Sequence, residues 1–460
     1  MSEGANTLLP PLAYYLKQTP GGILNKNSYV LNMLEIYFET YGCTANQNST
    51  EIMKGLVKTS NLNITDSIDY ADIVVINSCI VKEPTQEKIR NKLEILLKNK
   101  KIVILAGCMP RLNRKNLKYK NLYLLDTKSV TKIAELIKDI INKTYDEDKY
   151  LEVKNEIKLN LPKIPKEKII GITQISEGCE GNCSYCIVRL AKGKLNSYPE
   201  GKILASIKQD IESGCKEIWI TSQDNANYGN DSGNYTLPNL LNKILELKGN
   251  FLVRLGMCNP DNVLKILPQL IKTFNHPKMF KFLHLPIQSG SNKVLKDMNR
   301  KYKVEDALKI ISEFKKQIPD ITISTDIIVG YPTETEEDFD KTIELVEIIS
   351  PEILNRSNYG ARPNTKASKL KQISPSEMNR RSTKAMKLHL EICKKNQEKY
   401  KDWQGKVLVD SKGFGNTYLA RSKNYKLFAV KSDKDIIGKS VEIKVIKTLP
   451  HYLISELYEN

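Results

Sequence analysis

Short apolar runs alternate with helix-length segments along most of this chain, and this alternation limits the possible fold more than any other feature. The first four runs are Leu34 to Phe38, Asp72 to Ile76, Ile102 to Ala106 and Leu122 to Leu125. Strands that are buried on both faces read as continuous apolar runs, and parallel strands need a long crossover, usually a helix, between them. The pattern predicts a parallel α/β domain over residues 34–141.

The same alternation returns after residue 165. Six further runs lie near residues 169–174, 217–221, 251–255, 280–285, 321–329 and 353–358, and each gap has room for a helix. Six βα repeats predict a parallel partial (βα)6 barrel over residues 166–396, with its site at the carboxyl ends of the strands.

Three other segments lack this alternation. Residues 1–33 contain several Pro and Gly without a sustained period and are predicted to be a poorly ordered leader or a peripheral attachment. Residues 142–165 are rich in Lys, Asp and Asn and are predicted to be a linker. Residues 397–460 contain short β-rich runs separated by Gly, which predicts a small all-β barrel of the kind that binds nucleic acid.

Charge supports a nucleic-acid partner. The chain has 71 Lys and Arg against 53 Asp and Glu, a net charge of +18. Such an excess usually serves binding to a polyanion. Aromatic residues interleave with the basic ones in the last segment and are expected either to stack on RNA bases or to fill the barrel. They are Trp403, Phe414, Tyr418, Tyr425, Phe428 and Tyr452.

No apolar run is long enough to cross a membrane, and the start of the chain does not resemble a secretory signal. A cytoplasmic location with no membrane contact is therefore expected. In that reducing compartment, nine cysteines indicate metal binding or catalysis in preference to disulfides.

Three cysteines lie together in GCEGNCSYC, residues 178–186. Cys179, Cys183 and Cys186, here called the loop trio, directly follow the first strand predicted for the partial barrel. A 4Fe-4S cluster is ordinarily held by four cysteines, so three leave one iron open. A closed zinc site needs four nitrogen or sulfur ligands, and the nearest His in the sequence is His276. The loop trio therefore predicts a 4Fe-4S cluster with one open iron.

A second set of three cysteines is dispersed. Cys43, Cys79 and Cys108, here called the sheet trio, each follow a predicted strand of the first domain. Ligands of parallel α/β sheets collect at that edge, so these thiols are expected to converge on a second 4Fe-4S cluster. Any one of them alone has the simpler interpretation of a buried free cysteine. Cys215 and Cys393 are expected to be packing residues, Cys258 is left open, and no histidine is assigned a role.

The loop resembles the cluster-binding loop of the radical S-adenosylmethionine superfamily. The resemblance implies that the open iron binds the amino and carboxylate groups of S-adenosylmethionine. It also implies that an electron from the cluster splits the sulfonium bond to give a 5′-deoxyadenosyl radical. Tyr185 matches the aromatic residue common before the third cysteine, with simple packing as the alternative. Gln223, Arg254, Gln288 and Asp326 lie at predicted strand ends and are expected to contact the cofactor, or otherwise to face solvent.

Two trios in this order, followed by a small β-barrel, resemble the methylthiotransferases from Leu34 to the C-terminus. Further matching motifs are TSQD (221–224), HLPIQSGS (284–291), TDIIVGYPTETEEDF (325–339) and ARPNTKASKL (361–370). The last has Asn364 where the family usually has Gly. Because Asn tolerates left-handed backbone angles, the turn is expected to survive. The resemblance implies that the auxiliary cluster carries the sulfur and that the C-terminal barrel is a TRAM RNA-binding domain.

Within that family, RLGMCNP (254–260), EIWITSQD (217–224) and NHPKMFKFLHLPIQS (275–289) are most similar to the archaeal and eukaryotic branch. That branch acts on N6-threonylcarbamoyladenosine of tRNA, at position 37, 3′ to the anticodon. The resemblance implies replacement of the C2 hydrogen by a methylthio group, with one S-adenosylmethionine for radical chemistry and another as methyl donor. The implied partners are the anticodon stem-loop, an electron donor and a sulfur donor, the last two unidentified. A monomer is expected.

Two alternatives stay open. One keeps the chemistry and changes the target to isopentenyladenosine in tRNA or to an aspartate of a ribosomal protein. The basic, aromatic-bearing C-terminal segment favours tRNA over protein. The other is a non-catalytic iron-sulfur protein that binds RNA. The open iron disfavours it, since a purely structural cluster gains nothing from a missing ligand.

Overall fold

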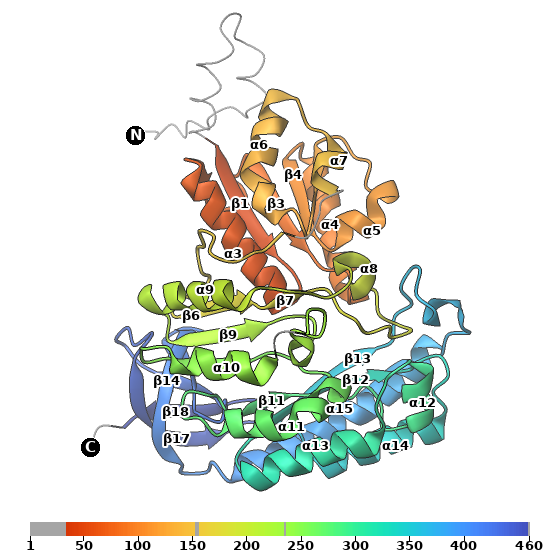
Figure 1. Ribbon diagram of the computed structural model, residues 1–460, viewed down its shortest axis with the longest axis vertical. Helices are drawn as coiled ribbons and strands as arrows, with labels where there is room; N and C mark the ends of the chain where they lie inside the picture. Colours follow the sequence, from red (N-terminus) through yellow and green to blue (C-terminus); the bar gives the residue numbers. More distant parts are fainter. Residues whose placement is uncertain (1–33, 152–155, 234–235, 459–460) are drawn as a thin grey trace, which may run out of the picture. The chain divides into compact units, whose positions relative to one another are not determined.

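The structure, a computed structural model, describes residues 34–151, 156–233 and 236–458 (Figure 1). The predicted leader, residues 1–33, lies outside this range. Contacts divide the chain into two compact units, one ending at Ile164 and one beginning at Pro165. Within the described residues, no helix has the length and apolarity that crossing a membrane requires.

The first unit contains a five-stranded parallel sheet, as the sequence predicts, in the order β2-β1-β3-β4-β5. Its strands are β1 (Glu35–Thr40), β2 (Asn63–Ile64), β3 (Ile73–Ser78), β4 (Ile102–Gly107) and β5 (Leu122–Asp126). Its helices are α3 (Thr44–Thr59), α4 (Glu83–Lys98), α5 (Met109–Asn113), α6 (Ile133–Asn142) and α7 (Glu147–Leu151), with short 3-10 turns at Arg114–Asn116 and Val130–Lys132.

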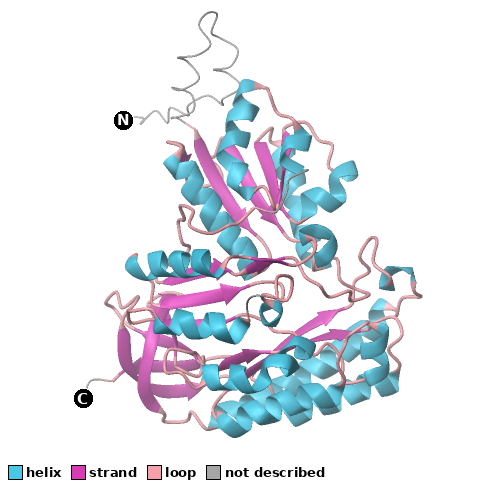
Figure 2. Cartoon of the chain, viewed as in Figure 1, coloured by secondary structure: helices cyan, strands magenta, loops and turns pink. Residues whose placement is uncertain are grey.

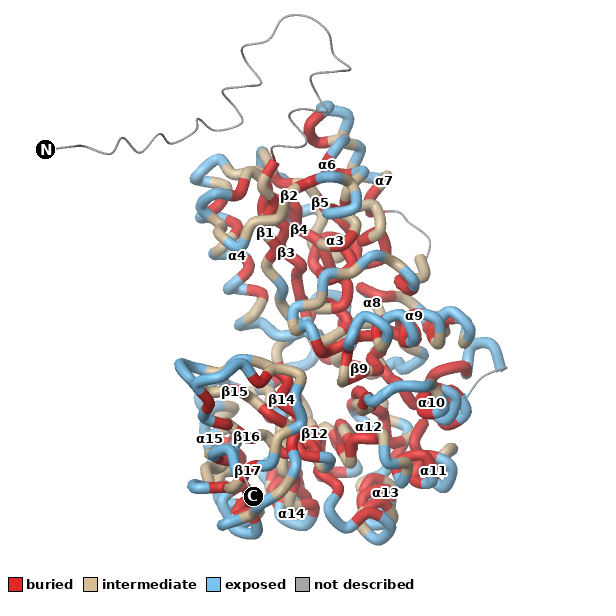
Figure 3. Tube along the Cα trace, turned by 90° about the vertical axis from the view of Figure 1, so that its left-hand side faces the viewer, coloured by how far each residue is buried: buried red, intermediate tan, exposed pale blue. Residues whose placement is uncertain are grey.

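The central strands of this sheet are buried on both faces, which explains their unbroken apolar sequence (Figure 3). Every residue of β3 is buried. The main core cluster joins β1, β3 and β4 to α3 and α6 and includes Ile36, Met53, Val75, Ile104 and Ile137. Burial of a side chain of this kind stabilises the fold by roughly 1.5–3 kcal/mol.

The described parts of the segment 142–165 include regular structure. It contains α7, and its last residues pack along α3, where the backbone N–H of Ile164 donates to the carbonyl oxygen of Glu51 at 3.0 Å. A Cβ on Gly55 would lie 2.2 Å from the carbonyl oxygen of Pro162. Glycine at position 55 is therefore what lets this segment lie against the helix.

The second unit begins with six parallel strands in sequence order, which confirms the predicted partial barrel (Figure 2). Hydrogen bonds on both sides of Val253 join the two groups of three strands. The strands are β6 (Ile170–Gln174), β9 (Glu217–Thr221), β10 (Leu252–Leu255), β11 (Phe282–His284), β12 (Thr322–Val329) and β13 (Ile353–Asn358), and β7 (Ser176–Glu177) pairs with β8 (Asn196–Ser197).

Helices cover the outside of these strands. They are α8 (Val188–Lys192), α9 (Glu200–Glu212), α10 (Leu237–Glu246), α11 (Pro260–Phe274), α12 (Asn292–Asp297), α13 (Val304–Gln317), α14 (Glu336–Ile349) and α15 (Pro375–Glu398), with 3-10 turns at Asn225–Asn227 and Ala367–Lys369. The long helix α15 has Ile392 and Ala385 in one core cluster with Ile327 and Val329 of β12 and Phe339 and Ile343 of α14.

The C-terminal segment forms a closed barrel in the order β14-β15-β16-β18-β17, as predicted. Its strands are β14 (Gln404–Lys412), β15 (Thr417–Arg421), β16 (Leu427–Lys431), β17 (Ser440–Thr448) and β18 (Leu453–Leu457). Sequence patterning does not reveal β18, which is short and pairs in parallel with β16 and antiparallel with β17. Phe428 and Tyr418 are buried in the barrel core.

The closed barrel packs directly on the strands of the partial barrel. Tyr425 is buried with Phe280 and Phe282, their ring centroids 4.9 and 4.7 Å from that of Tyr425. Leu408 of β14 packs with Ile170 and Ile172 of β6. The barrel is therefore part of the same compact unit as the strands that carry the loop trio.

Candidate iron-sulfur and cofactor sites

The sheet trio follows three neighbouring strands. The order β1-β3-β4 places Cys43, Cys79 and Cys108 beyond adjacent carboxyl ends. Cys43 is the residue before α3 and Cys108 the residue before α5, while Cys79 directly follows β3. Cys43 is exposed, whereas Cys79 and Cys108 are buried.

One buried carbonyl ties these three loops together. The Ser78 carbonyl oxygen accepts from Asn46 Nδ2 at 3.0 Å and from the Cys108 backbone N–H at 3.1 Å. Asn46 Nδ2 also donates to the Tyr41 carbonyl oxygen at 2.8 Å. Hydrogen bonds of this kind keep buried polar groups satisfied and fix the relative positions of the cysteine-bearing turns.

Two glycines let the turns approach one another. A Cβ on Gly42 would lie 2.8 Å from Cys79 Cβ and 3.0 Å from its Sγ. Gly107 would place a Cβ 2.4 Å from Asn77 Oδ1. Both have left-handed φ values, +105° and +92°, which disfavour any side chain.

The surroundings of Cys79 suit a thiolate ligand. Burial raises the pKa of its thiol, while the backbone N–H groups of Val81, Lys82 and Ile80 favour the anion and lower it. The Cys43 thiol is close enough to raise it further. A metal that displaces the proton from such a thiol leaves an anion with donors already in place.

The loop trio lies between β7 and α8. The position a Cβ would take on Gly181 is 3.2 Å from Cys179 Sγ and 3.9 Å from Cys183 Sγ, so both sulfurs border one small space. The Gly181 N–H donates to Cys179 Sγ at 3.2 Å. Gly178 begins the loop with φ +84°, and a Cβ there would lie 2.0 Å from the Lys194 carbonyl oxygen.

Two partly buried thiols of this loop, those of Cys179 and Cys186, resist ionisation without a metal. Burial, with the charge of Asp224, raises the pKa of Cys179 to about 12. Burial also raises the pKa of Cys186, against the backbone N–H groups of Val188 and Arg189, which favour its thiolate. Binding of metal at this loop therefore releases protons.

The donor set fits clusters better than single ions. No three His, Cys, Asp or Glu side chains among the described residues are close enough to hold one metal ion. A four-iron cluster does not require such closeness, because each cysteine binds a different iron. The Cys179 and Cys183 sulfurs, which border one space beside Gly181, are compatible with that geometry.

Of the predicted cofactor residues, Gln223 contacts the loop. Its Oε1 accepts from the Gly178 backbone N–H at 2.7 Å. Gln288 has φ +77°, and its backbone N–H donates to the Asp326 carbonyl oxygen at 2.7 Å. Asp326 Oδ1 lies 3.0 Å from His284 Nε2 and accepts from Asn355 Nδ2 at 2.7 Å. The prediction that Asp326 ends a strand is wrong, because β12 continues to Val329.

Arg254 contacts a different region from the one predicted. Its guanidinium carbon lies 5.0 Å from the ring centroids of Trp219 and Phe282 and 5.4 Å from that of Tyr425. Arg254 is the register partner of Trp219 in the pairing of β10 with β9, and it lies one residue before the end of β10. The side chain therefore lies at the contact with the C-terminal barrel.

Tyr185 shows the packing predicted as its alternative role. It lies against a buried cluster that includes Val294, Met298 and Tyr331. Burial raises the pKa of its hydroxyl well above the usual value. Asn364 has φ +64°, so it adopts the left-handed conformation expected at the position where the family usually has Gly.

Arg300 is a site residue that sequence analysis missed. Its Nη1 donates to Cys183 Sγ at 3.3 Å and its Nη2 to Asn259 Oδ1 at 2.7 Å. Asn259 Nδ2 in turn donates to Asp224 Oδ2 at 2.9 Å. Burial raises the pKa of Asp224. No strand-end argument reaches this residue, because it lies between α12 and α13.

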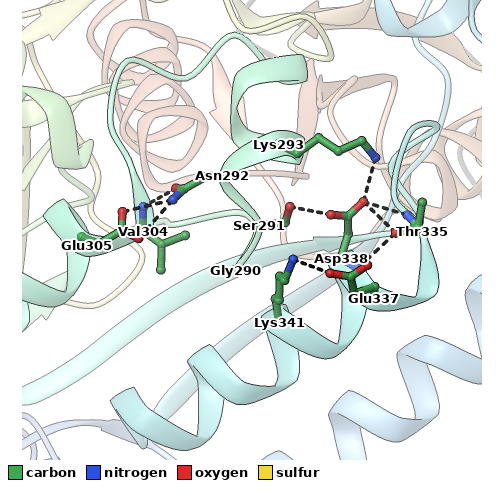
Figure 4. A pocket seen from close by; sticks show the side chains of 10 residues that line it. All are labelled: Gly290, Ser291, Asn292, Lys293, Val304, Glu305, Thr335, Glu337, Asp338 and Lys341. Carbon is green, nitrogen blue, oxygen red and sulfur yellow. Dashed lines mark hydrogen bonds and ion pairs between the residues drawn. The ribbon is translucent and has the colours of Figure 1, made fainter.

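A cavity of about 570 Å³ lies elsewhere in the second unit (Figure 4). It borders the first turns of α12, α13 and α14, and its lining contains no cysteine and no predicted cofactor residue. Its charged side chains pair with one another, Lys293 with Asp338 at 2.8 Å and Lys341 with Glu337 at 2.7 Å. These contacts are ion pairs at and near helix ends, and we assign the cavity no role in the chemistry.

The remaining cysteines are buried thiols. Cys393 Sγ lies 3.3 Å from His389 Nε2, and burial raises the pKa of this thiol to about 11. Cys258 is fully buried near Asp224, and burial raises its pKa well above the usual value. Cys215 is also buried. Packing is the role that these surroundings support for all three.

Family comparisons match one segment in the first unit and two in the second. Residues 35–125 match the uncharacterized protein family UPF0004, residues 173–346 the radical SAM superfamily, and residues 406–458 the TRAM domain. The solved structure of the radical S-adenosylmethionine methyltransferase TsrM from Kitasatospora setae has a similar fold. It covers 73% of this chain and 77% of its own, with a TM-score of 0.51 and 13% identity.

Relatives that match along most of the chain identify its family more specifically. A probable threonylcarbamoyladenosine tRNA methylthiotransferase of Pyrococcus horikoshii is 36% identical, with 92% of this chain and 100% of the relative covered. The threonylcarbamoyladenosine tRNA methylthiotransferase of Homo sapiens is 32% identical, with 93% and 74% covered. Because these matches run through both cysteine sites and the C-terminal barrel, the chain belongs to the threonylcarbamoyladenosine tRNA methylthiotransferase family of radical SAM enzymes.

Proposed function

We propose that this protein replaces the C2 hydrogen of N6-threonylcarbamoyladenosine, 3′ to the anticodon of a tRNA, with a methylthio group. The observation that carries the proposal is the presence of two separate three-cysteine sites on one chain. Cys179 and Cys183 of the loop trio border a common space beside Gly181, and the sheet trio follows three adjacent strands. Each site supplies one ligand fewer than a fully coordinated four-iron cluster needs.

The loop trio would hold the cluster that generates the radical. When bound, a 4Fe-4S cluster with an open iron supplies the electron that cleaves S-adenosylmethionine. Cys179, Cys183 and Cys186 provide the thiolates, and Gln223 holds Gly178 at the start of the loop. Gln288 and Asp326, joined by a backbone hydrogen bond, remain candidates for contacts with the cofactor.

The sheet trio would hold an auxiliary cluster that carries the sulfur. Cys43 is the exposed member, whereas Cys79 and Cys108 are buried. An exposed ligand beside two buried ones leaves the site accessible from one side. This is the access that a nucleoside and a sulfur source would need.

The C-terminal barrel supplies a surface for RNA. Phe414, at the turn between β14 and β15, is 97% exposed and offers a ring on which an unpaired base can stack. Tyr418, Tyr425 and Phe428 are buried and serve packing. Exposed Lys412 and Lys431 on the adjoining strands offer contacts to phosphate.

Nucleoside mass spectrometry tests this function. tRNA from cells lacking the gene should contain N6-threonylcarbamoyladenosine without its 2-methylthio derivative, and the derivative should return with the intact gene. The matched control is the gene carrying Cys183→Ala, which should not restore it. Restoration by that variant, or loss of a methylthio group from isopentenyladenosine instead, would contradict the proposal.

A further inference from the structure

We propose that Arg300 is a positioning residue that stabilises the reduced form of the cluster held by the loop trio. The inference rests on the proposed function, because it assumes a cluster at Cys179, Cys183 and Cys186. It goes further by naming the group that sets how readily that cluster accepts its electron.

The first observation is the contact with sulfur. Arg300 Nη1 lies 3.3 Å from Cys183 Sγ, within the range of a hydrogen bond to sulfur. Reduction adds one negative charge to a cluster, and hydrogen bonds to its sulfurs are among the features that set its potential. A donor that also carries positive charge favours the more negative form more strongly than a neutral donor does.

The second observation is what Arg300 lacks. None of the hydrogen bonds or ion pairs of Arg300 in the described chain involves a carboxylate. By contrast, Arg381 of the same unit pairs with Glu334 at 2.9 Å. Because no carboxylate neutralises the half-buried Arg300 guanidinium, its positive charge acts fully on the thiolate that it contacts.

The third observation is that the guanidinium is held in place. Nη2 donates to Asn259 Oδ1 at 2.7 Å, and Nε donates to the Tyr302 hydroxyl at 3.2 Å. The Tyr302 ring lies 5.0 Å from the guanidinium carbon. Asn259 is itself fixed by two hydrogen bonds to the buried Asp224. A preorganised donor of this kind keeps its geometry whether or not the cluster is reduced.

The chain offers a matched control on the same loop. Arg189 Nη1 donates to the carbonyl oxygens of Glu180 and Gly181, both at 3.3 Å. Among the described residues, its side chain makes no hydrogen bond to sulfur. Arg189→Gln therefore removes a positive charge beside the loop without removing a donor to a cluster ligand.

The test is a redox titration of full-length protein followed by electron paramagnetic resonance. The sheet trio is replaced by alanine so that one cluster gives the signal, titanium(III) citrate is the reductant, and no S-adenosylmethionine is present. Arg300→Gln should lower the ratio of reduced to oxidised cluster at a fixed potential about tenfold, a shift of about 59 mV for one electron. Arg189→Gln should leave the midpoint unchanged.

Each outcome decides the proposal. An unchanged midpoint in Arg300→Gln with four irons retained overturns it, as does a change that occurs only when S-adenosylmethionine is added. If Arg300→Gln does not retain its irons, Arg300→Lys replaces it. Lysine keeps the positive charge but cannot contact Cys183 and Asn259 at the same time as the guanidinium does. A smaller lowering of the midpoint potential than for Arg300→Gln is therefore expected, and an unchanged midpoint overturns the role. Absence of iron in the parent protein would instead overturn the proposed function.

Discussion

The loop trio and the sheet trio provide similar ligands by different means. Eight residues of chain contain the whole loop trio, and its shape depends on short-range features such as the backbone bond from the Cys186 N–H to the Cys183 carbonyl oxygen. The sheet trio spans 66 residues and forms only when β1, β3 and β4 lie side by side. A site contained in one loop can keep its shape when the rest of the fold loosens, whereas a site dispersed over three strands is lost when those strands separate.

The largest expected effect comes from removing a loop ligand. Cys183→Ala should abolish both cleavage of S-adenosylmethionine to 5′-deoxyadenosine and formation of methylthiolated tRNA, because the radical depends on that cluster. The measurement is single-turnover product analysis after anaerobic reconstitution. Persistent cleavage with fewer than four irons at the loop would break the assignment.

Removing a ligand of the sheet trio should separate the two activities. Cys79→Ala should retain substantial cleavage of S-adenosylmethionine and make no methylthiolated tRNA, because only bond formation to sulfur needs the second site. Iron content must be measured alongside, with about four irons expected instead of about eight. Wild-type product formation by a variant that keeps its loop cluster would remove the sheet trio from the sulfur step.

A glycine change tests the dependence of the sheet trio on tertiary packing. Gly42→Ala should destabilise the first unit by roughly 2–4 kcal/mol, because a Cβ there meets Cys79 at 2.8 Å and φ is +105°. Iron at the sheet trio should fall while iron at the loop trio stays. Gly201→Ala is the matched control: nothing lies within 4 Å of its Cβ, and alanine favours the helix it occupies. Equal stability of both variants in thermal unfolding would contradict the argument.

Removing one side-chain amide at each site tests the independence of the two trios with a smaller expected loss of stability. Asn46→Ala removes both donors from Nδ2 at the sheet trio, and Gln223→Ala removes the acceptor for Gly178 at the loop trio. Each should cost roughly 1–3 kcal/mol of unfolding free energy. Each should reduce iron at its own trio only. Loss of iron at both trios from either single change would show that the two sites are not independent.

The smallest expected effect is a pH dependence confined to the unit with the loop trio. Burial, with the nearby charge of Asp410, raises the pKa of Glu217 to about 7. Between the ordinary carboxyl pKa and about 7 the folded state holds a proton that the unfolded state has released, so stability falls as pH rises through that window. Glu217→Gln should remove this fall and stabilise the second unit at pH 8 by about 1–3 kcal/mol. Thermal unfolding of both proteins at pH 5 and pH 8 measures this difference in stability. An equal pH response in variant and wild type would contradict the assignment of the pH dependence to Glu217.

The fold class and the place of each cysteine after a strand were predictable because they depend on local patterns. Buried parallel strands must be apolar throughout, as β3 is, so their positions and those of the cysteines that follow them are readable in the sequence. The spacing within the loop trio is set by the few residues of chain that join its cysteines. Strand β18 was not predictable, because its five residues, with Glu456 and Leu457 exposed, acquire strand geometry only from pairing with β16 and β17.

Thiol spacing and strand pattern, both readable in the sequence, set which chemistry the chain can hold, since they follow from covalent connection and local burial. Which polar side chains serve that chemistry depends on tertiary packing. Arg254 and Arg300 are both arginines near predicted barrel elements, yet one packs on Tyr425 and the other contacts Cys183. A long flexible side chain takes the direction set by its packed neighbours, and those neighbours come from distant parts of the chain.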